Sequence, residues 1–147
     1  MAVSASVSVA FVGSGGAGVL TTGGMLLEAA CAAGWYGMLT RSVGAQIRGG
    51  EAAAMVQLAT HPVECLTDCF DLMIGVDWQN AHRFDAEIPL GPHSLVIGDP
   101  RGGDPPKSIA ASGARYVEIP MKEMTKATPA WRSNMICLLY TSDAADE

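Results

Sequence analysis

VGSGGAGVL, residues 12–20, carries three glycines at the G-x-G-x-x-G spacing that lets a strand turn into a helix beneath a pyrophosphate. The segment before it, SVSVAFV (6–12), is rich in β-branched residues and has no internal turn former, which predicts a buried parallel strand. The segment after it, VLTTGGMLLEAACAAG (19–34), is apolar at helical spacing and ends in Gly34, a natural helix stop. Together they predict a strand–turn–helix unit.

An NAD ligand at such a turn needs an acid roughly 20 residues further on to hold the adenosine ribose. Where the second strand is expected to end, WYGMLTRS (35–42) contains Arg41 and neither Asp nor Glu. The sequence therefore disfavours NAD. Three alternatives stay open for the turn. They are another phosphate-bearing ligand, NADP with its 2'-phosphate on Arg41, or no ligand, with the glycines serving only strand–helix packing and subunit contact.

Strands and helical segments alternate along the rest of the chain. Further strands are expected at residues 36–40, 51–59, 70–77, 94–99 and 114–119, with a loop at 41–51, an amphipathic segment at 78–88 and PMKEMTKA (120–127) after the last strand. This order predicts a Rossmann-like α/β fold, in which a mostly parallel sheet carries helices on both faces.

Composition limits the class of protein. A chain of 147 residues with 49% hydrophobic content can bury one core, and its net charge of -6 argues against a nucleic-acid surface. No apolar run is long enough to span a bilayer and no signal-type segment opens the chain, so we expect a cytoplasmic protein without membrane contact. The four cysteines form no C-x-x-C pair, so neither a zinc ribbon nor an iron–sulfur cluster is expected.

The last residues, CLLYTSDAADE (137–147), do not continue the pattern before them. They look like the in-frame translation of a transposon-type sequencing adapter. We therefore expect the domain to comprise residues 1–136, to be truncated at its C-terminus, and to be followed by a tail that does not belong to the fold.

Ligands of open parallel sheets bind outside the carboxyl ends of the strands. In this chain those ends comprise the glycine turn, the loop at 41–51 and the acids Asp77 and Asp99. Because each acid ends an apolar strand just before a turn, we expect both to serve as N-caps or in Asx-turns. We identify no paired Ser, His and Asp that would form a nucleophilic triad.

The arginines of the 41–51 loop are more informative. Arg41 and Arg48 are the only Lys or Arg residues among the first 80 positions. Arg48 is followed by Gly49 and Gly50, which would let backbone N–H groups and a guanidinium approach a phosphate or carboxylate without obstruction by Cβ atoms. These residues favour an anion site, although two solvated loop arginines remain the alternative.

At these motifs the sequence resembles a known family. The glycine turn, the loop RS-x-G-x-Q-x-RGGE, FDLMIGVDW, LVIGDP and MKEM...NM follow the order of the gamma domain of 2-oxoacid:ferredoxin (acceptor) oxidoreductases. The likeness is to the form in which this domain is fused ahead of the alpha region, in the pyruvate, 2-oxoglutarate and ketoisovalerate oxidoreductase family. The sequence departs from that pattern at TPAWRS (128–133), where a glycine-rich turn similar to PGGR is expected.

The resemblance implies an accessory role. Enzymes of this family decarboxylate a 2-oxoacid on thiamine diphosphate, pass electrons through iron–sulfur clusters to ferredoxin or a similar acceptor, and in most members transfer the acyl group to coenzyme A. Their gamma domain packs against the alpha-type region and the thiamine-binding beta subunit, which hold those cofactors, and in several members it helps to hold coenzyme A. In agreement, this sequence has no GDG...N thiamine motif and no cluster cysteines. We expect the isolated chain to be inactive.

The residues expected to contact a cofactor lie in the turn and the loop, and we predict no catalytic or metal-binding residue. They are Gly13, Ser14, Gly15, Gly16, Gly18, Arg41, Arg48, Gly49 and Gly50. With the resemblance, coenzyme A becomes the expected phosphate-bearing ligand. The alternative function is an independent Rossmann-type oxidoreductase domain that binds NADP or a flavin.

Overall fold

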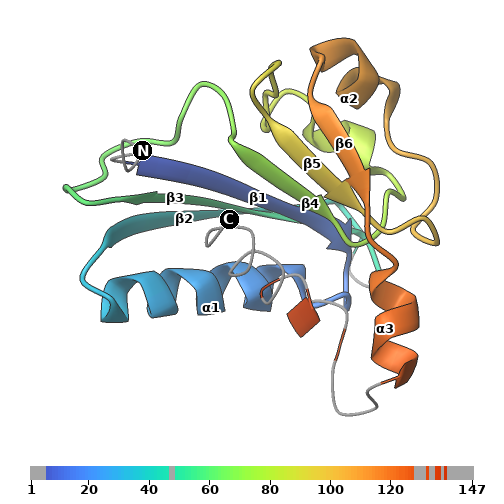
Figure 1. Cartoon of the computed structure of the whole chain (residues 1–147), viewed down its shortest axis with the longest axis horizontal. Helices are drawn as coiled ribbons and strands as arrows, with labels where there is room; N and C mark the ends of the chain where they lie inside the picture. Colours follow the sequence, from blue (N-terminus) through green and yellow to red (C-terminus); the bar gives the residue numbers. More distant parts are fainter. Residues whose placement is uncertain (1–5, 47–48, 128–131, 133–134, 137, 139–147) are drawn as a thin grey trace.

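The computed structural model describes residues 6–46, 49–127, 132, 135, 136 and 138 of the 147. The chain forms one six-stranded sheet with helices packed against it (Figure 1). In chain order the elements are β1 (Ser6–Ser14), α1 (Val19–Ala32), β2 (Tyr36–Val43), β3 (Glu51–Ala59), β4 (Leu72–Gly75), the 3-10 helix η1 (Ala81–Phe84), β5 (Leu95–Gly98), α2 (Lys107–Ser112), β6 (Arg115–Glu118) and α3 (Met121–Ala127).

The sheet is mostly parallel, as the alternation of strands and helical segments predicts. Its strand order is β2-β3-β1-β4-β5-β6. The pairings β1–β4, β4–β5 and β5–β6 are parallel, whereas β3 runs antiparallel to both of its neighbours, β1 and β2. The carboxyl ends of β1, β4, β5 and β6 therefore meet along one edge of the sheet.

The antiparallel placement of β3 follows from its connection. A parallel neighbour of β2 would need a crossover of about a dozen residues or more to return the chain to the starting edge. Only residues 44–50 separate the two strands, so β3 begins at the edge where β2 ends. The pairing with β3 also extends β2 to Val43, three residues beyond the expected end at Thr40.

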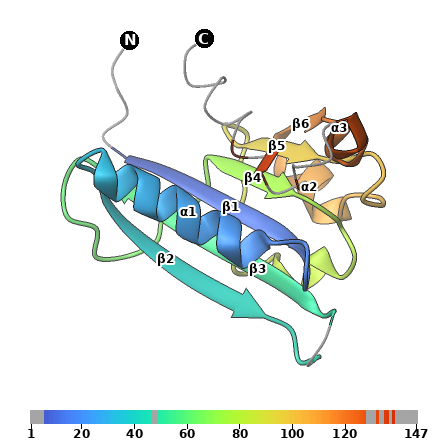
Figure 2. The same cartoon turned by 90° about the horizontal axis from the view of Figure 1, so that it is seen from below.

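Helices cover both faces of the sheet, which confirms the expected fold class. On one face α1 and α3 pack with β1, β3 and β4 around Phe11, Val56 and Met121. Figure 2 shows α1 lying along the strands of this face, and Gly23 allows the close approach because a Cβ there would lie 2.7 Å from Ala54 Cβ. On the other face η1 and α2 cover a second cluster that includes Ile109.

Two helical elements differ from expectation. The amphipathic segment 78–88 forms only the single turn η1, because Asn80 adopts a left-handed conformation with φ of 59° and a helix cannot pass through it. The helix α2 was not expected. Only Ile109 of its six residues is buried, so the sequence of this helix shows no apolar repeat at helical spacing.

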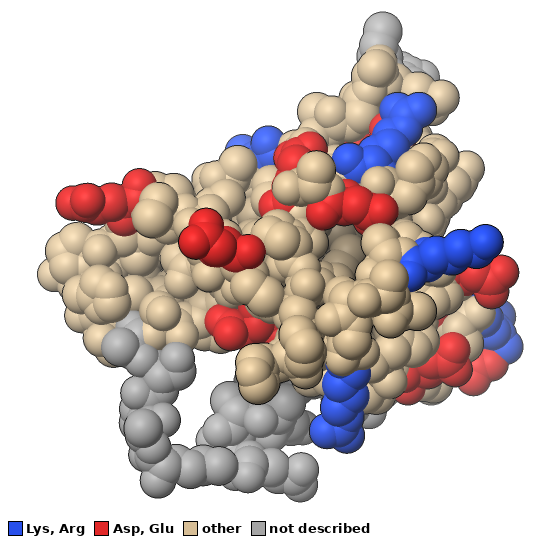
Figure 3. All heavy atoms as spheres, turned by 90° about the horizontal axis from the view of Figure 1, so that it is seen from above, with Lys and Arg blue, Asp and Glu red and all other residues tan. Residues whose placement is uncertain are grey.

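The surface carries mixed charge. On the face opposite α1, Lys and Arg side chains lie among Asp and Glu side chains without forming a continuous basic patch (Figure 3). Among the described residues, no helix combines the length and the apolar character needed to cross a membrane. The expected domain limit at residue 136 stays a prediction, since of the tail 137–147 only Leu138 lies within the described residues.

Candidate functional site

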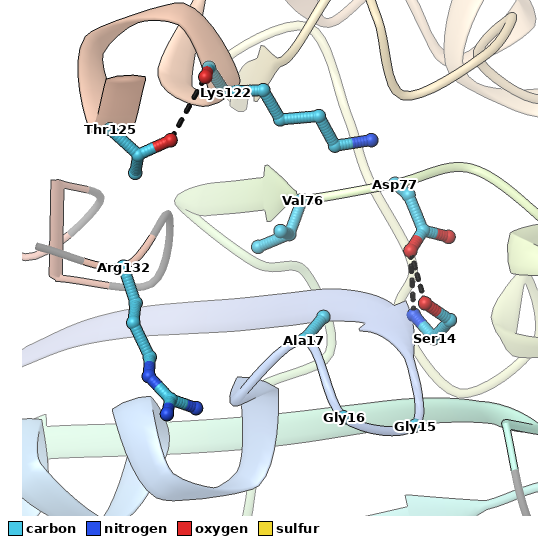
Figure 4. A pocket seen from close by; sticks show the side chains of 9 residues that line it. All are labelled: Ser14, Gly15, Gly16, Ala17, Val76, Asp77, Lys122, Thr125 and Arg132. Carbon is cyan, nitrogen blue, oxygen red and sulfur yellow. Dashed lines mark hydrogen bonds between the residues drawn. The ribbon is translucent and has the colours of Figure 1, made fainter. Parts of the chain in front are cut away.

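A cleft opens at the edge of the sheet where the parallel strands end, between the turn after β1 and the helix α3 (Figure 4). It consists of a hollow of about 580 Å³ and an adjoining hollow of about 320 Å³ at the start of α1. We call the two together the glycine-turn cleft. The first hollow is lined by Ser14, Gly15, Gly16, Ala17, Val76, Asp77, Lys122, Thr125 and Arg132. The second is lined by Ser14, Gly15, Gly16, Gly18, Val19, Leu20, Thr21, Ala52 and Arg132.

The N-terminus of α1 faces the second hollow. Gly18 is the N-cap and lies in the left-handed region with φ of 79°, a conformation that favours glycine. No side chain caps this end and no acid lies in the first turn. The first N–H groups of a helix have no partner within the helix, and with the helix dipole they favour an anion. Gly13 contributes differently, since a Cβ there would lie 2.8 Å from Val19 Cγ2 and would push α1 off the sheet.

The 44–50 loop contacts the glycine turn directly, although about thirty residues separate them in the sequence. The N–H of Gly15 donates to the carbonyl oxygen of Gly50 at 2.5 Å, and Gly49 lies beside them. A Cβ at Gly15 would lie 3.1 Å from that oxygen, so the contact needs glycine or a small shift. Turn and loop thus come together as the sequence predicts, with Gly49 and Gly50 supporting the turn rather than lining the cleft.

Of the two predicted arginines, only Arg41 lies within the described residues. Arg41 lies within β2 and not in the loop, because β2 extends to follow β3 and pairs Arg41 with Ala54. Its side chain is exposed on the edge strand and is not among the residues lining the glycine-turn cleft. The expectation that Arg41 is a loop residue is therefore wrong. Arg48 lies outside the described residues, and its role as an anion ligand stays a prediction.

Asp77 joins the ends of β1 and β4. Its Oδ2 accepts from the N–H of Ser14 at 3.0 Å and from the Ser14 hydroxyl, and its Oδ1 accepts from the N–H of Gln79 at 3.2 Å. The last bond is the Asx-turn expected from the sequence. These three donors satisfy the carboxylate oxygens, and through two of them Asp77 fixes Ser14 at the cleft.

Asp99 plays the corresponding role for α3. It is fully buried, with Oδ1 accepting from the N–H of Arg101 at 2.8 Å and Oδ2 from the N–H of Lys122 at 2.6 Å. The first bond confirms the expected Asx-turn. The second binds the first turn of α3 to the end of β5, and thereby places Lys122 at the wall of the cleft.

Two cations that were not predicted line the glycine-turn cleft. In Figure 4 the Lys122 side chain extends toward Asp77 and the Arg132 guanidinium extends toward α1. Lys122 Nζ donates to the carbonyl oxygen of Arg101 at 3.2 Å. The Arg132 side chain makes no hydrogen bond or ion pair with another described residue. The only available signal was that PMKEMTKA follows a parallel strand and so begins at the binding edge.

The site is suited to holding an anion. Uncompensated donors of α1 and two cations surround it, and no cluster of three or more His, Cys, Asp or Glu among the described residues could hold a metal ion. The family model of pyruvate ferredoxin/flavodoxin oxidoreductase matches residues 8–146.

This chain belongs to that family. Among curated proteins, the chain is similar to the indolepyruvate oxidoreductase subunit IorB of Archaeoglobus fulgidus. The two are 32% identical over 125 residues, which cover 83% of this chain and 61% of the archaeal subunit. The family membership predicted from the motifs is thereby confirmed.

Three solved structures share the fold. A 2-oxoglutarate:ferredoxin oxidoreductase from Magnetococcus marinus, with 2-oxoglutarate, coenzyme A and succinyl-CoA bound, has a TM-score of 0.74 and 26% identity over 92% of this chain and 24% of its own. The gamma subunit of a keto/oxoacid ferredoxin oxidoreductase from Geobacter sulfurreducens has a TM-score of 0.62 and 18% identity, covering 88% of this chain and 69% of that one. The pyruvate oxidoreductase subunit PORC of Thermotoga maritima has a TM-score of 0.66 and 15% identity, covering 87% and 68%.

The chain spans less than two thirds of the curated subunit and about a quarter of the Magnetococcus chain. The activity, substrates and partners of the whole enzyme are therefore matters for proposal. At 18% and 15% identity, the Geobacter and Thermotoga subunits show a shared fold only.

Proposed function

We propose that this chain is the gamma domain of a thiamine-diphosphate-dependent 2-oxoacid:ferredoxin (acceptor) oxidoreductase, and that its glycine-turn cleft holds the phosphate groups of coenzyme A. The observation that carries the ligand proposal is the uncapped N-terminus of α1, which faces the same cleft as Lys122 and Arg132. Coenzyme A bears a pyrophosphate and a 3'-phosphate, and such groups bind helix N-termini and guanidinium groups well.

The charge balance of the cleft supports this proposal. Among the described residues that line it, Lys122 and Arg132 are the two cationic side chains and Asp77 is the one acid. The acid keeps its negative charge, so the described lining residues carry one more positive than negative charge. The Magnetococcus relative binds coenzyme A, which agrees with a phosphate-bearing ligand in this family.

The domain would act as part of a larger enzyme. We place thiamine diphosphate and the iron–sulfur clusters on partner regions, with an alpha-type region and a thiamine-binding beta subunit as neighbours and ferredoxin or a similar protein as acceptor. We also propose a fusion ahead of an alpha-type region, which is supported by the likeness to one part of the much longer Magnetococcus chain. We further propose a cytoplasmic enzyme. An independent NADP-binding domain has less support, because Arg41, which would receive the 2'-phosphate, does not line the cleft.

Removal of either cation should weaken coenzyme A binding. For Lys122→Met and Arg132→Met we expect the Kd of coenzyme A, measured by calorimetry on the full chain, to rise about tenfold or more, since a charge-assisted hydrogen bond contributes about 1.5–3 kcal/mol. Lys126→Met is the matched control, because Lys126 is exposed on the same helix but does not line the cleft.

Pantetheine, which lacks the phosphates, should not compete with coenzyme A in the same titration. If the wild-type chain and both cleft variants bind coenzyme A with equal affinity, coenzyme A does not bind in this cleft. If pantetheine displaces coenzyme A, the chain recognises the pantetheine end of the ligand and not its phosphates.

The isolated chain should have no 2-oxoacid oxidoreductase activity, because its sequence carries neither a thiamine motif nor cluster cysteines. We expect no dye reduction when the purified chain receives pyruvate or 2-oxoglutarate together with thiamine diphosphate and coenzyme A. Sustained turnover above the level of a buffer control would contradict the accessory role.

A further inference from the structure

The first residue of β3, Glu51, is an acid in a buried position. Its side chain is only 2% exposed, although it lies at the edge of the sheet where the 44–50 loop returns. A buried carboxylate is unfavourable unless it is paired and hydrogen-bonded. Glu51 must therefore have partners that make this position tolerable, and those partners define what the residue does.

Its charged partner comes from η1. Arg83 Nη1 lies 2.6 Å from Glu51 Oε1 and donates to it, while the Arg83 side chain is 54% exposed. The pKa of Glu51 is lowered, and the largest cause is a hydrogen bond from its own backbone N–H. Burial has a smaller opposing effect, and the hydrogen bond and charge of Arg83 lower the pKa further. The pair therefore joins the buried start of β3 to a segment that follows β4.

The carboxylate also touches the other end of the loop. A Cβ on Gly44 would lie 2.7 Å from Glu51 Oε2 and closer still to Oε1, and the N–H of Gly44 donates to the Glu51 carbonyl oxygen at 2.8 Å. Both ends of the 44–50 loop thus meet at Glu51. Only glycine leaves room for the carboxylate at position 44.

From Glu51 the contacts lead into the glycine turn. In the β1–β3 ladder Glu51 lies opposite Ser14, and the preceding Gly50 accepts the hydrogen bond from Gly15. We propose that Arg83, acting through its ion pair with Glu51, is a positioning residue that holds Gly50 against the glycine turn and so sets the shape of the glycine-turn cleft.

The inference about the turn stands on its own geometry, and only its consequence for coenzyme A rests on the proposed function. The pair Arg101–Glu123 offers a comparison within the same chain, because both of those side chains are about half exposed. Exposed pairs contribute little to stability. Arg83 is about as exposed as Arg101, but Glu51 is buried, so the loss of Arg83 leaves a buried carboxylate without its charged partner. The two pairs should therefore respond differently to the loss of one member.

Amide hydrogen exchange, followed by NMR on the full chain, tests this inference. For Arg83→Met we expect exchange at the Gly15 amide to accelerate about tenfold or more, while exchange at Val56, in the middle of β3, changes much less. Arg83→Lys should give a smaller acceleration, since an ammonium keeps the charge but lacks the planar fork. Glu123→Gln, which breaks the exposed pair, should leave the Gly15 amide unchanged.

Unchanged exchange at Gly15 in Arg83→Met would overturn the inference, as would a parallel acceleration at Gly15 and Val56, which would indicate a general loss of stability. If Arg83→Met does not fold, the same comparison in Arg83→Lys decides. A coenzyme A titration of the same variants separates the two proposals. Faster exchange at Gly15 without any change in affinity keeps the positioning role and counts against coenzyme A in this cleft.

Discussion

Gly75→Ala should cost the domain about 3 kcal/mol or more of its unfolding free energy, measured by urea denaturation, which is a large share of the stability of an ordinary domain. The methyl group would enter the ring of the buried Trp78, lying 2.6 Å from Cζ3 and closer still to two other ring carbons. Gly98, which pairs with Gly75 in the β4–β5 ladder, lies under the same indole, since a Cβ there would be 2.9 Å from Cζ2.

A second glycine supplies the control. Gly24 lies inside α1, and a Cβ there would meet nothing within 4 Å. Gly24→Ala should therefore stabilise the domain by about 0.5–1 kcal/mol, because alanine restricts the unfolded chain and suits a helix. If Gly75→Ala and Gly24→Ala shift the urea midpoint in the same direction, the indole does not occupy the place described for it.

Asp99→Ala should destabilise the domain by about 2–5 kcal/mol, since two backbone N–H groups would each lose a carboxylate acceptor in a buried position. The same change should weaken coenzyme A binding, because it frees the first turn of α3 and with it Lys122. Urea denaturation and calorimetry measure the two effects. Asp99→Asn keeps one acceptor and should recover part of both.

Asp104→Ala is the matched control, because this acid is exposed in the same connection between β5 and α2. A stability loss for Asp99→Ala no larger than that of Asp104→Ala would mean that α3 is held by its apolar contacts alone. In that case coenzyme A affinity should also survive the substitution.

The parts of the fold that the sequence predicts are those with local causes. The β-branched run before the glycine turn and the apolar period after it give β1 and α1, and the Asx-turns of Asp77 and Asp99 depend on neighbours two residues away. The mostly parallel sheet follows from alternation along the chain. In each case the interacting residues are close in sequence.

The missed features depend on contacts between distant segments. The place of β3 between β1 and β2 is set by its pairing with both strands, and the pairing with β2 also moved Arg41 out of the loop. Lys122 and Arg132 reach the cleft from more than a hundred residues beyond the glycine turn, through the order of β4, β5 and β6. No local sequence pattern around Lys122 or Arg132 predicts that arrangement.

The strand order also bears on how the chain folds during synthesis. The first two strands, β1 and β2, are not paired with each other, because β3 lies between them and β4 lies on the other side of β1. The ribosome must therefore extend the chain through β3 before either early strand gains a neighbour in the sheet. The β1–β3 pairing joins distant segments, so it carries a loop-closure penalty and slows folding. Until then α1 has no sheet to cover, and the apolar strands of the nascent chain are open to chaperones.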